Sequence, residues 1–282
     1  MKKNISFYIP AYNAEKTIKK TITSIQNQSI LVDEIILIDD FSKDKTVEIV
    51  RSEFPNIKII INKENMGLGY NRNLAINEAK NDIVAAIDSD VILDKYWIEN
   101  LIPEIERENV IMCGGKMNEQ LLNNKINLWR AKYYSQNWGK NLVLDPPFLF
   151  GCNTMLIKSI WKKVNGYNEE LKTNGEDINF IHRIRSKTDG QIIYQPSAKC
   201  YHLQDDSIET LSKRVWRYHS FAYKIKEPSI KKLFKLSVKQ SKFFIQRFFK
   251  SLIVFDFSDI SISYKVLKNF IKLEYIFLNK KK

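Results

Sequence analysis

Glycine is scarce in this sequence, and none lies where nucleotide-binding loops require it. Only 9 of the 282 residues are glycine. A dinucleotide-binding fold places a Gly-rich phosphate loop after its first strand, whereas the turn after the first apolar segment here reads Pro10-Ala11-Tyr12-Asn13. A Gly-x-x-x-x-Gly-Lys segment is absent as well. These absences argue against dinucleotide-dependent hydride transfer and P-loop hydrolysis, so bound phosphates would be held by a metal ion and side chains.

Cysteines and long apolar runs are also few. Cys113, Cys152 and Cys200 are too scattered for a disulfide framework or a Cys-based zinc site, and we expect them to be buried free thiols. No run reaches the ~18 apolar residues that span a bilayer, and Ile5–Ile9 is too short for a signal-peptide core. We therefore expect a cytoplasmic protein.

Acidic side chains are scarce only toward the end of the chain. The formal net charge is +13, and residues 211–282 hold 18 Lys and Arg against 4 Asp and Glu. Residues 1–210 hold 27 basic and 28 acidic side chains and are nearly neutral. The main body therefore shows no nucleic-acid surface, and the positive charge belongs to a tail.

The most informative segment present is Ile83–Asp90, IVAAIDSD. Its short apolar run predicts a strand buried on both faces, as in a parallel sheet. Asp88 and Asp90 follow at its end, and two carboxylates cannot stay uncompensated in a core. Carboxylate oxygens are hard ligands that suit Mg²⁺ or Mn²⁺. The segment therefore indicates a metal site at the end of a strand.

Strand-like and helix-like segments alternate from Ile5 to Cys113, which predicts an α/β, Rossmann-like, doubly wound and mostly parallel sheet. The expected strands are Ile5–Ile9 (stopped by Pro10), Glu34–Ile38, Ile57–Ile61, the strand ending at Asp88, and Val110–Cys113, separated by helices that include Ala14–Asn27, one capped by Ser42, and Tyr96–Glu106. Ligands bind at the carboxyl ends of such strands. Three polar clusters fall there: Pro10–Asn13, Asp39-Asp40 and Asp88–Asp90.

In their order and spacing, these segments resemble the family 2 glycosyltransferases, which have the GT-A fold. The resemblance rests on Pro10–Asn13, Ile38–Thr46, Asn65-Met66-Gly67 with Arg72-Asn73, Asp88–Asp90, Gly151–Leu156, Val164–Glu169, Gly175–Phe180 with Arg183, and His202. Phe41, Asn71 and Asn165 depart from the usual pattern without removing a functional group. The resemblance implies a catalytic domain over residues 1–210, with a nucleotide-binding half (1–115) and an acceptor-side half (116–210), before a basic amphipathic helical tail (211–282).

The resemblance also implies roles for site residues. A divalent cation, Mn²⁺ or Mg²⁺, would be held by Asp90 and His202, with Asp88 contacting ribose or orienting a water of the ion. Asp177 would be the base that activates the acceptor hydroxyl, and Glu176 would bind that hydroxyl or position Asp177. From the residues alone, Glu176 and Asp177 could equally begin a helix.

The nucleotide-sugar donor would be bound by a further set of residues. Asp40 would accept a hydrogen bond from the ring N–H of the base, which favours uracil or thymine although guanine also has such a donor. Tyr12 would stack on the base, and Arg72 would steady Asp40 or reach a phosphate. The set is completed by Pro10, Asn13, Asp88 and, in the strand that lines the sugar pocket, Asn153.

The resulting hypothesis is an inverting, metal-dependent glycosyltransferase that moves a sugar, from a UDP-sugar in the first instance, to a hydroxyl of a glycan or lipid-linked glycan, as in cell-surface polysaccharide synthesis. One alternative is a polyprenyl-phosphate sugar synthase, whose ionised acceptor would need no base such as Asp177. Another is a sugar-nucleotide-binding protein without catalysis, although that would need neither Asp90 nor Asp177. A nucleotidyltransferase would want a Gly-rich, Arg-containing loop in place of Pro10–Asn13.

The tail combines an apolar helical face with lysines. Apolar residues from Ile230 through Phe244 to Leu252 share one side of a helix, and lysines such as Lys235 and Lys242 flank it. Lys265–Leu278 repeats the pattern before Lys280-Lys281-Lys282. Such a helix is typical of binding in the plane of an anionic membrane, here the inner face of the cell membrane. Two helices packed on the catalytic domain would give the same pattern, and nucleic acid is not an expected partner.

Overall fold

The computed structural model describes residues 4–221, 230–253 and 256–279, and the chain forms two compact units. Unit 1 comprises Met1–Gln120 and Gln136–Leu203, and unit 2 comprises Leu121–Ser135 and Gln204–Lys282. The sequence placed the start of the tail at residue 211, but the chain enters unit 2 directly after Leu203 and unit 2 also takes in a segment from the middle of the chain.

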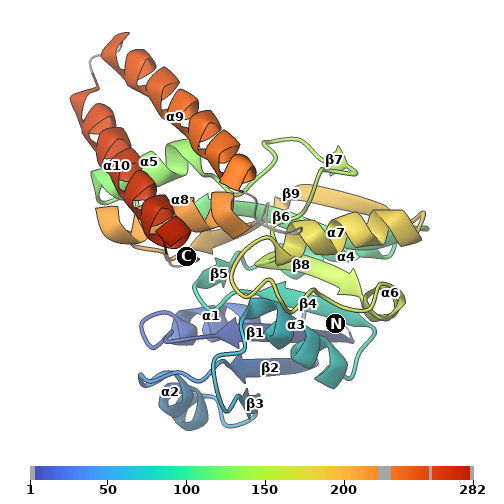
Figure 1. Cartoon of the computed structure of the whole chain (residues 1–282). Helices are drawn as coiled ribbons and strands as arrows, with labels where there is room; N and C mark the ends of the chain where they lie inside the picture. Colours follow the sequence, from blue (N-terminus) through green and yellow to red (C-terminus); the bar gives the residue numbers. More distant parts are fainter. Residues whose placement is uncertain (1–3, 222–229, 254–255, 280–282) are drawn as a thin grey trace. The chain divides into compact units, whose positions relative to one another are not determined.

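Unit 1 is built on one mixed sheet in the order β3-β2-β1-β4-β8-β6-β9-β5, with β7 paired to β9 (Figure 1). Its strands are β1 (Ile5–Ala11), β2 (Glu34–Asp39), β3 (Lys58–Ile61), β4 (Ile83–Ile87), β5 (Val91–Leu93), β6 (Val110–Glu119), β7 (Val143–Leu144), β8 (Asn153–Ile157) and β9 (Gln191–His202). β1 to β4 pair in parallel as expected, and β8 enters antiparallel between β4 and β6. The expected α/β class is therefore confirmed.

Helices cover both faces of this sheet. They are α1 (Ile18–Gln26), α2 (Thr46–Glu53), α3 (Leu68–Glu78), α4 (Trp97–Ile105), α6 (Lys158–Lys163) and α7 (Glu176–Lys187). Successive residues of β1 point to opposite faces: Phe7 packs in the core under α1, α2 and α4, while Tyr8 packs in the core under α3 and α7. Because the central strands are buried on both sides, their sequences are continuous apolar runs.

Three local expectations are corrected. Pro10 does not stop β1 but lies within it, buried and paired with Ile38. Ser42 does not cap α2, which begins at Thr46 without a side-chain cap. The hydroxyl of Ser42 instead accepts a hydrogen bond from the backbone N–H of Asn13. β6 continues to Glu119 because Gly115 allows a close approach to β9, where an added Cβ would lie 2.0 Å from the carbonyl oxygen of Ala198.

Unit 2 is helical. It contains α5 (Lys125–Tyr133), α8 (Ile208–Phe221), α9 (Ile230–Ile253) and α10 (Phe257–Asn279). Its core combines Trp129 of α5 with Leu211, Val215, Phe244, Ile262, Val266 and Phe270. Phe244 therefore packs inside unit 2, although the sequence placed it on a membrane-facing side. The side chains of Ile230, Leu233 and Phe234 and the residues Lys280–Lys282 lie outside the described part. Within that part, no helix has both the length and the hydrophobicity of a membrane span.

Candidate active site

Unit 1 brings the three predicted polar clusters to one edge of the sheet. β1 pairs in parallel with β2 and with β4, so the carboxyl ends of all three strands lie at the same edge. Ala11 is in register with Asp39, and Asp88 follows directly after β4. Pro10–Asn13, Asp39-Asp40 and Asp88–Asp90 thus surround the position where ligands bind in sheets of this kind.

Asp40 is buried and holds a loop together. Its Oδ1 accepts hydrogen bonds from Asn62 Nδ2 and the backbone N–H of Met66, each at 2.8 Å, and its Oδ2 accepts from the backbone N–H of Gly67 at 2.9 Å. Gly67 has a φ of 89°, which favours glycine, and an added Cβ would lie 2.7 Å from that of Lys172. Arg72 makes none of these contacts, so the expectation that it steadies Asp40 is wrong.

Asp39, to which the sequence motifs assign no separate role, has a carboxylate with fewer hydrogen-bond donors than that of Asp40. Its side chain is buried, and its Oδ2 accepts a hydrogen bond from the backbone N–H of Ser42 at 3.1 Å. Its Oδ1 is buried without a hydrogen-bond partner among the described residues. Because a buried carboxylate oxygen without a donor is costly, Asp39 is better placed than Asp40 to accept a hydrogen bond from a ligand.

The turn after β1 is tied to the turn after β2. The backbone N–H of Asn13 donates to Ser42 Oγ at 2.9 Å, and Asn13 Oδ1 accepts from the backbone N–H of Lys43 at 2.8 Å. Asn13 adopts a φ of 52°, a region that asparagine tolerates. Tyr12 next to it is exposed, so its ring is available for stacking. Asn13 therefore positions the loops, and Pro10 contributes only from within β1.

Arg72 is the central cation of the site. Its side chain is 1% exposed, its Nη2 lies 3.1 Å from Asp88 Oδ1, and its Nε lies 3.4 Å from Glu176 Oε1. The hydroxyl of Tyr8 lies 3.5 Å from its Nη1. Arg72 therefore joins the carboxylate after β4 to the start of α7, and its burial argues against direct contact with a phosphate in solvent.

Asp177 lies beside this cluster in the first turn of α7. Its Oδ2 accepts a hydrogen bond from the backbone N–H of Gly151 at 3.2 Å. An added Cβ at Gly151 would lie 3.1 Å from Arg72 Nη2 and 3.2 Å from the Asp177 Cβ, which puts both side chains against one backbone position. Burial raises the pKa of Asp177, and burial together with the charge of Asp177 raises the pKa of Glu176 to about 8. A raised pKa makes the ionised form of Asp177 a stronger base, whereas Glu176 with a pKa of about 8 is mainly protonated at neutral pH.

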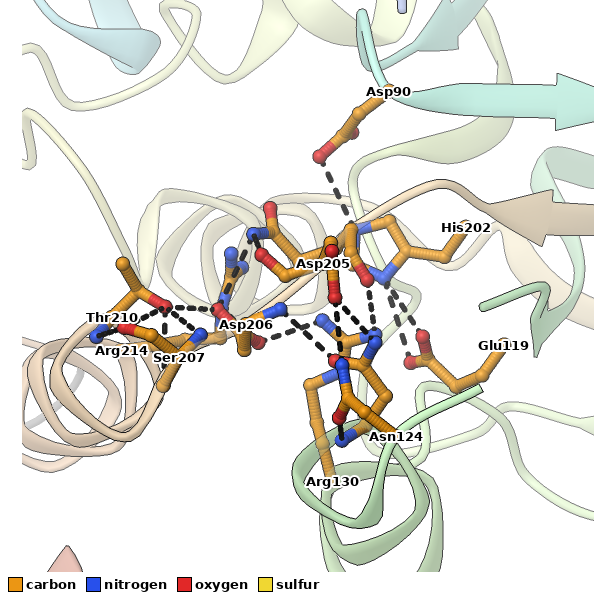
Figure 2. Close-up of polar contacts among 12 residues, drawn as sticks. Asp90, Glu119, Asn124, Arg130, His202, Asp205, Asp206, Ser207, Thr210 and Arg214 are labelled. Atoms are coloured by element: carbon orange, nitrogen blue, oxygen red, sulfur yellow. Dashed lines mark hydrogen bonds and ion pairs between the residues drawn. The ribbon is translucent and has the colours of Figure 1, made fainter. Parts of the chain in front are cut away.

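His202 lies between two carboxylates at the end of β9 (Figure 2). Its Nε2 is 3.3 Å from Asp90 Oδ2, and its Nδ1 is 3.3 Å from Glu119 Oε2. Sheet pairing brings them together, because Val91 and Glu119 are both in register with His202. Burial lowers the pKa of His202, but Asp90 and Glu119 outweigh it and raise that pKa to about 9. The sequence pattern does not indicate Glu119, because Gly114-Gly115 interrupts the apolar run of β6 before its second half.

The donor atoms of Asp90 and of neutral His202 fit a divalent cation, whose binding would displace the proton from the His202 Nε2. The Asp90 side chain is 30% exposed, and a carboxylate with an imidazole nitrogen beside it is a ligand set that Mn²⁺ accepts. Glu119 on the other ring nitrogen is the outer carboxylate that orients metal-binding histidines. The described residues contain no group of three or more His, Cys, Asp or Glu side chains that could hold a metal ion. Asp90 and His202 would be the protein ligands of such a cation.

Asn153 does not line an open pocket, contrary to expectation. Its side chain is buried, and its Oδ1 accepts a hydrogen bond from Trp97 Nε1 at 2.5 Å. It stabilises the packing of α4 on β8. Arg183 is likewise structural, since its guanidinium donates to Asn179 Oδ1 and to the backbone oxygen of Val164.

An open, mostly parallel α/β sheet with carboxylates gathered at its carboxyl edge is the arrangement of GT-A fold enzymes. The chain belongs to glycosyl transferase family 2, whose model matches residues 6–164. This confirms the resemblance that the sequence motifs indicated.

Relatives and solved structures agree with this placement. An uncharacterized glycosyltransferase of Haemophilus influenzae is 31% identical over 156 residues, covering 54% of this chain and 47% of that protein. A glucosyl-dolichyl phosphate glucuronosyltransferase of Haloferax volcanii is 22% identical over 216 residues, covering 70% of this chain and 68% of that protein. The crystal structure of S. aureus TarS 1-349 is similar with a TM-score of 0.61 at 18% identity, covering 96% of this chain and 92% of that one. The chain spans 47% of the Haemophilus protein and 24% of a similar Escherichia coli chondroitin synthase.

Proposed function

We propose that this protein transfers a sugar, with inversion, from a nucleoside diphosphate sugar to a hydroxyl of a glycan or lipid-linked glycan. The observation that carries the proposal is the pairing, in unit 1, of a cation-binding geometry at Asp90 and His202 with a carboxylate of raised pKa at Asp177. Transfer requires charge stabilisation on a departing diphosphate and a base for the acceptor, and the two features supply one each.

Each residue has a distinct part in this reaction. Asp90 and His202 would hold a divalent cation, which supplies Lewis-acid stabilisation of the diphosphate charge. Asp177 accepts the proton of the attacking hydroxyl, and Glu176, held by Arg72 at 3.4 Å, positions Asp177 or binds the acceptor. Asp88, held by Arg72 at 3.1 Å, faces the ribose side.

As the residue that accepts a hydrogen bond from the nucleobase, we propose Asp39 in place of Asp40. Its Oδ1 is the oxygen left without a donor, whereas the oxygens of Asp40 accept hydrogen bonds from Asn62, Met66 and Gly67. A ring N–H such as that of uracil would satisfy Asp39, and Tyr12, exposed beside it, would stack on the ring. A UDP-sugar therefore remains our proposed donor.

A lipid-linked acceptor is supported by the similarity to the Haloferax enzyme, which its name associates with glucosyl-dolichyl phosphate. A polyprenyl-phosphate sugar synthase fits less well, because an ionised phosphate acceptor needs no base and would meet the carboxylate of Asp177. We propose the cytoplasm as the compartment, since the three cysteines are free and buried and need no oxidising environment.

A donor panel tests the proposal. UDP-, GDP-, CDP- and dTDP-sugars are each added with Mn²⁺, and both thermal protection and donor hydrolysis are measured. We expect uridine or thymidine sugars to raise the melting temperature only when Mn²⁺ is present. Equal protection by all nucleotides without a metal ion would contradict the proposed donor site.

A further inference from the structure

The two long helices of unit 2, α9 and α10, each have one buried and one exposed side. On α9, Phe244, Arg247 and Ser251 are buried. On α10, the buried residues include Ile262, Val266 and Phe270. This inward side completes the core of unit 2 with Trp129, so it cannot be the side that meets a partner.

The exposed side of α9 carries large apolar side chains on one face, with Lys242 between the first two of them. Val238, Ile245, Phe249 and Leu252 are spaced at i, i+7, i+11 and i+14, which puts them on one helix face. They are 40–59% exposed. Phe248 and Ile253 extend the row toward the end of the helix and are exposed as well.

The exposed side of α10 repeats this arrangement. Phe257, Tyr264, Ile271 and Tyr275 lie at i, i+7, i+14 and i+18 and are 52–69% exposed. Single exposed apolar residues are ordinary in soluble proteins. Rows of them on two helices that pack together are not, and such patches mark interaction sites.

Lysines lie beside both rows and, at Lys242 and Lys268, within them, and acidic residues are turned inward. Seven lysines are exposed on the described parts of the two helices: Lys235, Lys239, Lys242, Lys250, Lys265, Lys268 and Lys272. Between residues 230 and 279 the only acidic residues are Asp256, Asp259 and Glu274. Asp259 and Glu274 are buried, and Asp259 accepts hydrogen bonds from Lys132, Tyr133 and Ser251. Apart from the half-buried Asp256, the outward charge of these helices is therefore positive.

We propose that the outward faces of α9 and α10 bind the surface of a membrane that contains anionic lipids. The apolar rows would enter the boundary between headgroups and acyl chains, tyrosines would lie at headgroup level, and lysines would contact lipid phosphates. A second copy of this chain is disfavoured as the occupant because it would bring lysines against lysines. Nucleic acid would satisfy the lysines but would leave the apolar rows in water.

Vesicle sedimentation of the full-length protein tests the proposal. Phosphatidylcholine vesicles with and without phosphatidylglycerol are compared at low and high salt. We expect binding that requires phosphatidylglycerol, weakens with salt because the lysine contribution is screened, and persists in part because apolar burial is not. The triple variant Ile245→Ser, Phe249→Ser and Leu252→Ser should bind at least about tenfold more weakly. Its melting temperature should stay unchanged, since all three side chains are exposed.

A matched control comes from unit 1. Leu31 is 62% exposed, as apolar as the replaced residues and distant in sequence from α9 and α10, so Leu31→Ser should bind vesicles like the unchanged protein. Equal binding to vesicles with and without phosphatidylglycerol, or a triple variant that binds as the parent does, would overturn the proposal. So would a dimer, seen by light scattering, that the triple variant dissociates while vesicles are ignored. The readout needs no sugar transfer, so the inference does not rest on the proposed function.

Discussion

Both units bury carboxylates, but they surround them differently. In unit 2, Asp206 lies 2.7 Å from Arg130 Nη1 and 3.6 Å from Arg214 Nε, and it accepts a hydrogen bond from Thr210 Oγ1 at 2.9 Å (Figure 2). Asp259 Oδ2 likewise accepts three hydrogen bonds, from Lys132 and Tyr133 at 2.5 Å and from Ser251 at 3.0 Å. In unit 2 the donors that neutralise these charges belong to the unit itself.

At the edge of the unit 1 sheet, two cations are each shared by a pair of carboxylates. Arg72 is shared by Asp88 and Glu176, and His202 is shared by Asp90 and Glu119. Asp39 Oδ1 has no hydrogen-bond partner in the described part of the chain. A buried charge with matched donors contributes to folding, whereas an unmatched one destabilises unless a ligand supplies the donor or cation. Our proposed function accounts for this difference, because a bound cation and donor would complete the partners of the carboxylates at the edge of the unit 1 sheet.

The largest effect should come from the cation site. Asp90→Ala removes a charged ligand, and we expect Mn²⁺-dependent binding of the nucleoside diphosphate to be lost and kcat/KM to fall by about 10³–10⁵-fold, because a bound metal supplies several kcal/mol. Calorimetry with and without Mn²⁺ measures the first effect. Asp82→Asn, an exposed carboxylate just before the other end of β4, is the matched control and should change neither value. Unchanged Mn²⁺-dependent affinity in Asp90→Ala would remove Asp90 from the site.

Replacing the proposed catalytic base, Asp177, should have nearly as large an effect, but on the rate of transfer alone. Asp177→Asn keeps the size of the side chain and one oxygen for the backbone N–H groups of Gly151 and Ile178, from both of which the carboxylate accepts, and donor affinity should stay within a few-fold. Transfer should fall by about 10²–10⁴-fold, the usual contribution of a positioned base. Single-turnover rates and donor titrations separate the two. If donor affinity and rate fell together, Asp177 would be structural.

The sequence predicted unit 1 far better than unit 2. The apolar runs of β1, β2 and β4 and the polar residues at their ends are local features, so motif and periodicity placed them correctly. The partners of those residues are not local. Glu119 reaches His202 only because Gly115 lets β6 run on beside β9, and the carboxylate of Asp40 accepts its hydrogen bonds from residues 62–67.

In unit 2 the sequence pattern was ambiguous in a physical sense. A row of apolar residues on a helix shows that something covers it but not what does. Phe244 is covered by the core of unit 2, whereas Phe249, five residues later, is exposed. Trp129 of α5, more than 100 residues before Phe244, is what makes the difference, and no local pattern links the two.

A third substitution tests whether the buried ion pairs of unit 2 stabilise the fold. Asp206→Ala leaves the guanidinium of Arg130, itself buried, without its main partner, and we expect unfolding free energy to fall by about 3–5 kcal/mol. Asp205→Ala is the neighbouring control: its carboxylate is exposed and, within the described ranges, accepts hydrogen bonds from the neutral amides of Asn124 and Asn127, so about 1 kcal/mol should be lost. Urea denaturation measures both. Equal losses would show that burial of the Arg130 pair is not what stabilises unit 2.

The smallest effect should come from Asp39, because only the contact of its Oδ1 with the nucleobase would be lost. In Asp39→Asn, the amide oxygen can still accept from the backbone N–H of Ser42, but its NH₂ group would then face the ring N–H of uracil, donor against donor. We expect UDP to bind about 10–100-fold more weakly, the equivalent of a charge-assisted hydrogen bond of about 1.5–3 kcal/mol. CDP has an acceptor at the same ring position, so its affinity should rise relative to that of UDP. The UDP to CDP ratio, measured by calorimetry with Mn²⁺, is therefore diagnostic, because damage to the loop would weaken both nucleotides alike. An unchanged ratio would return the base-binding role to Asp40.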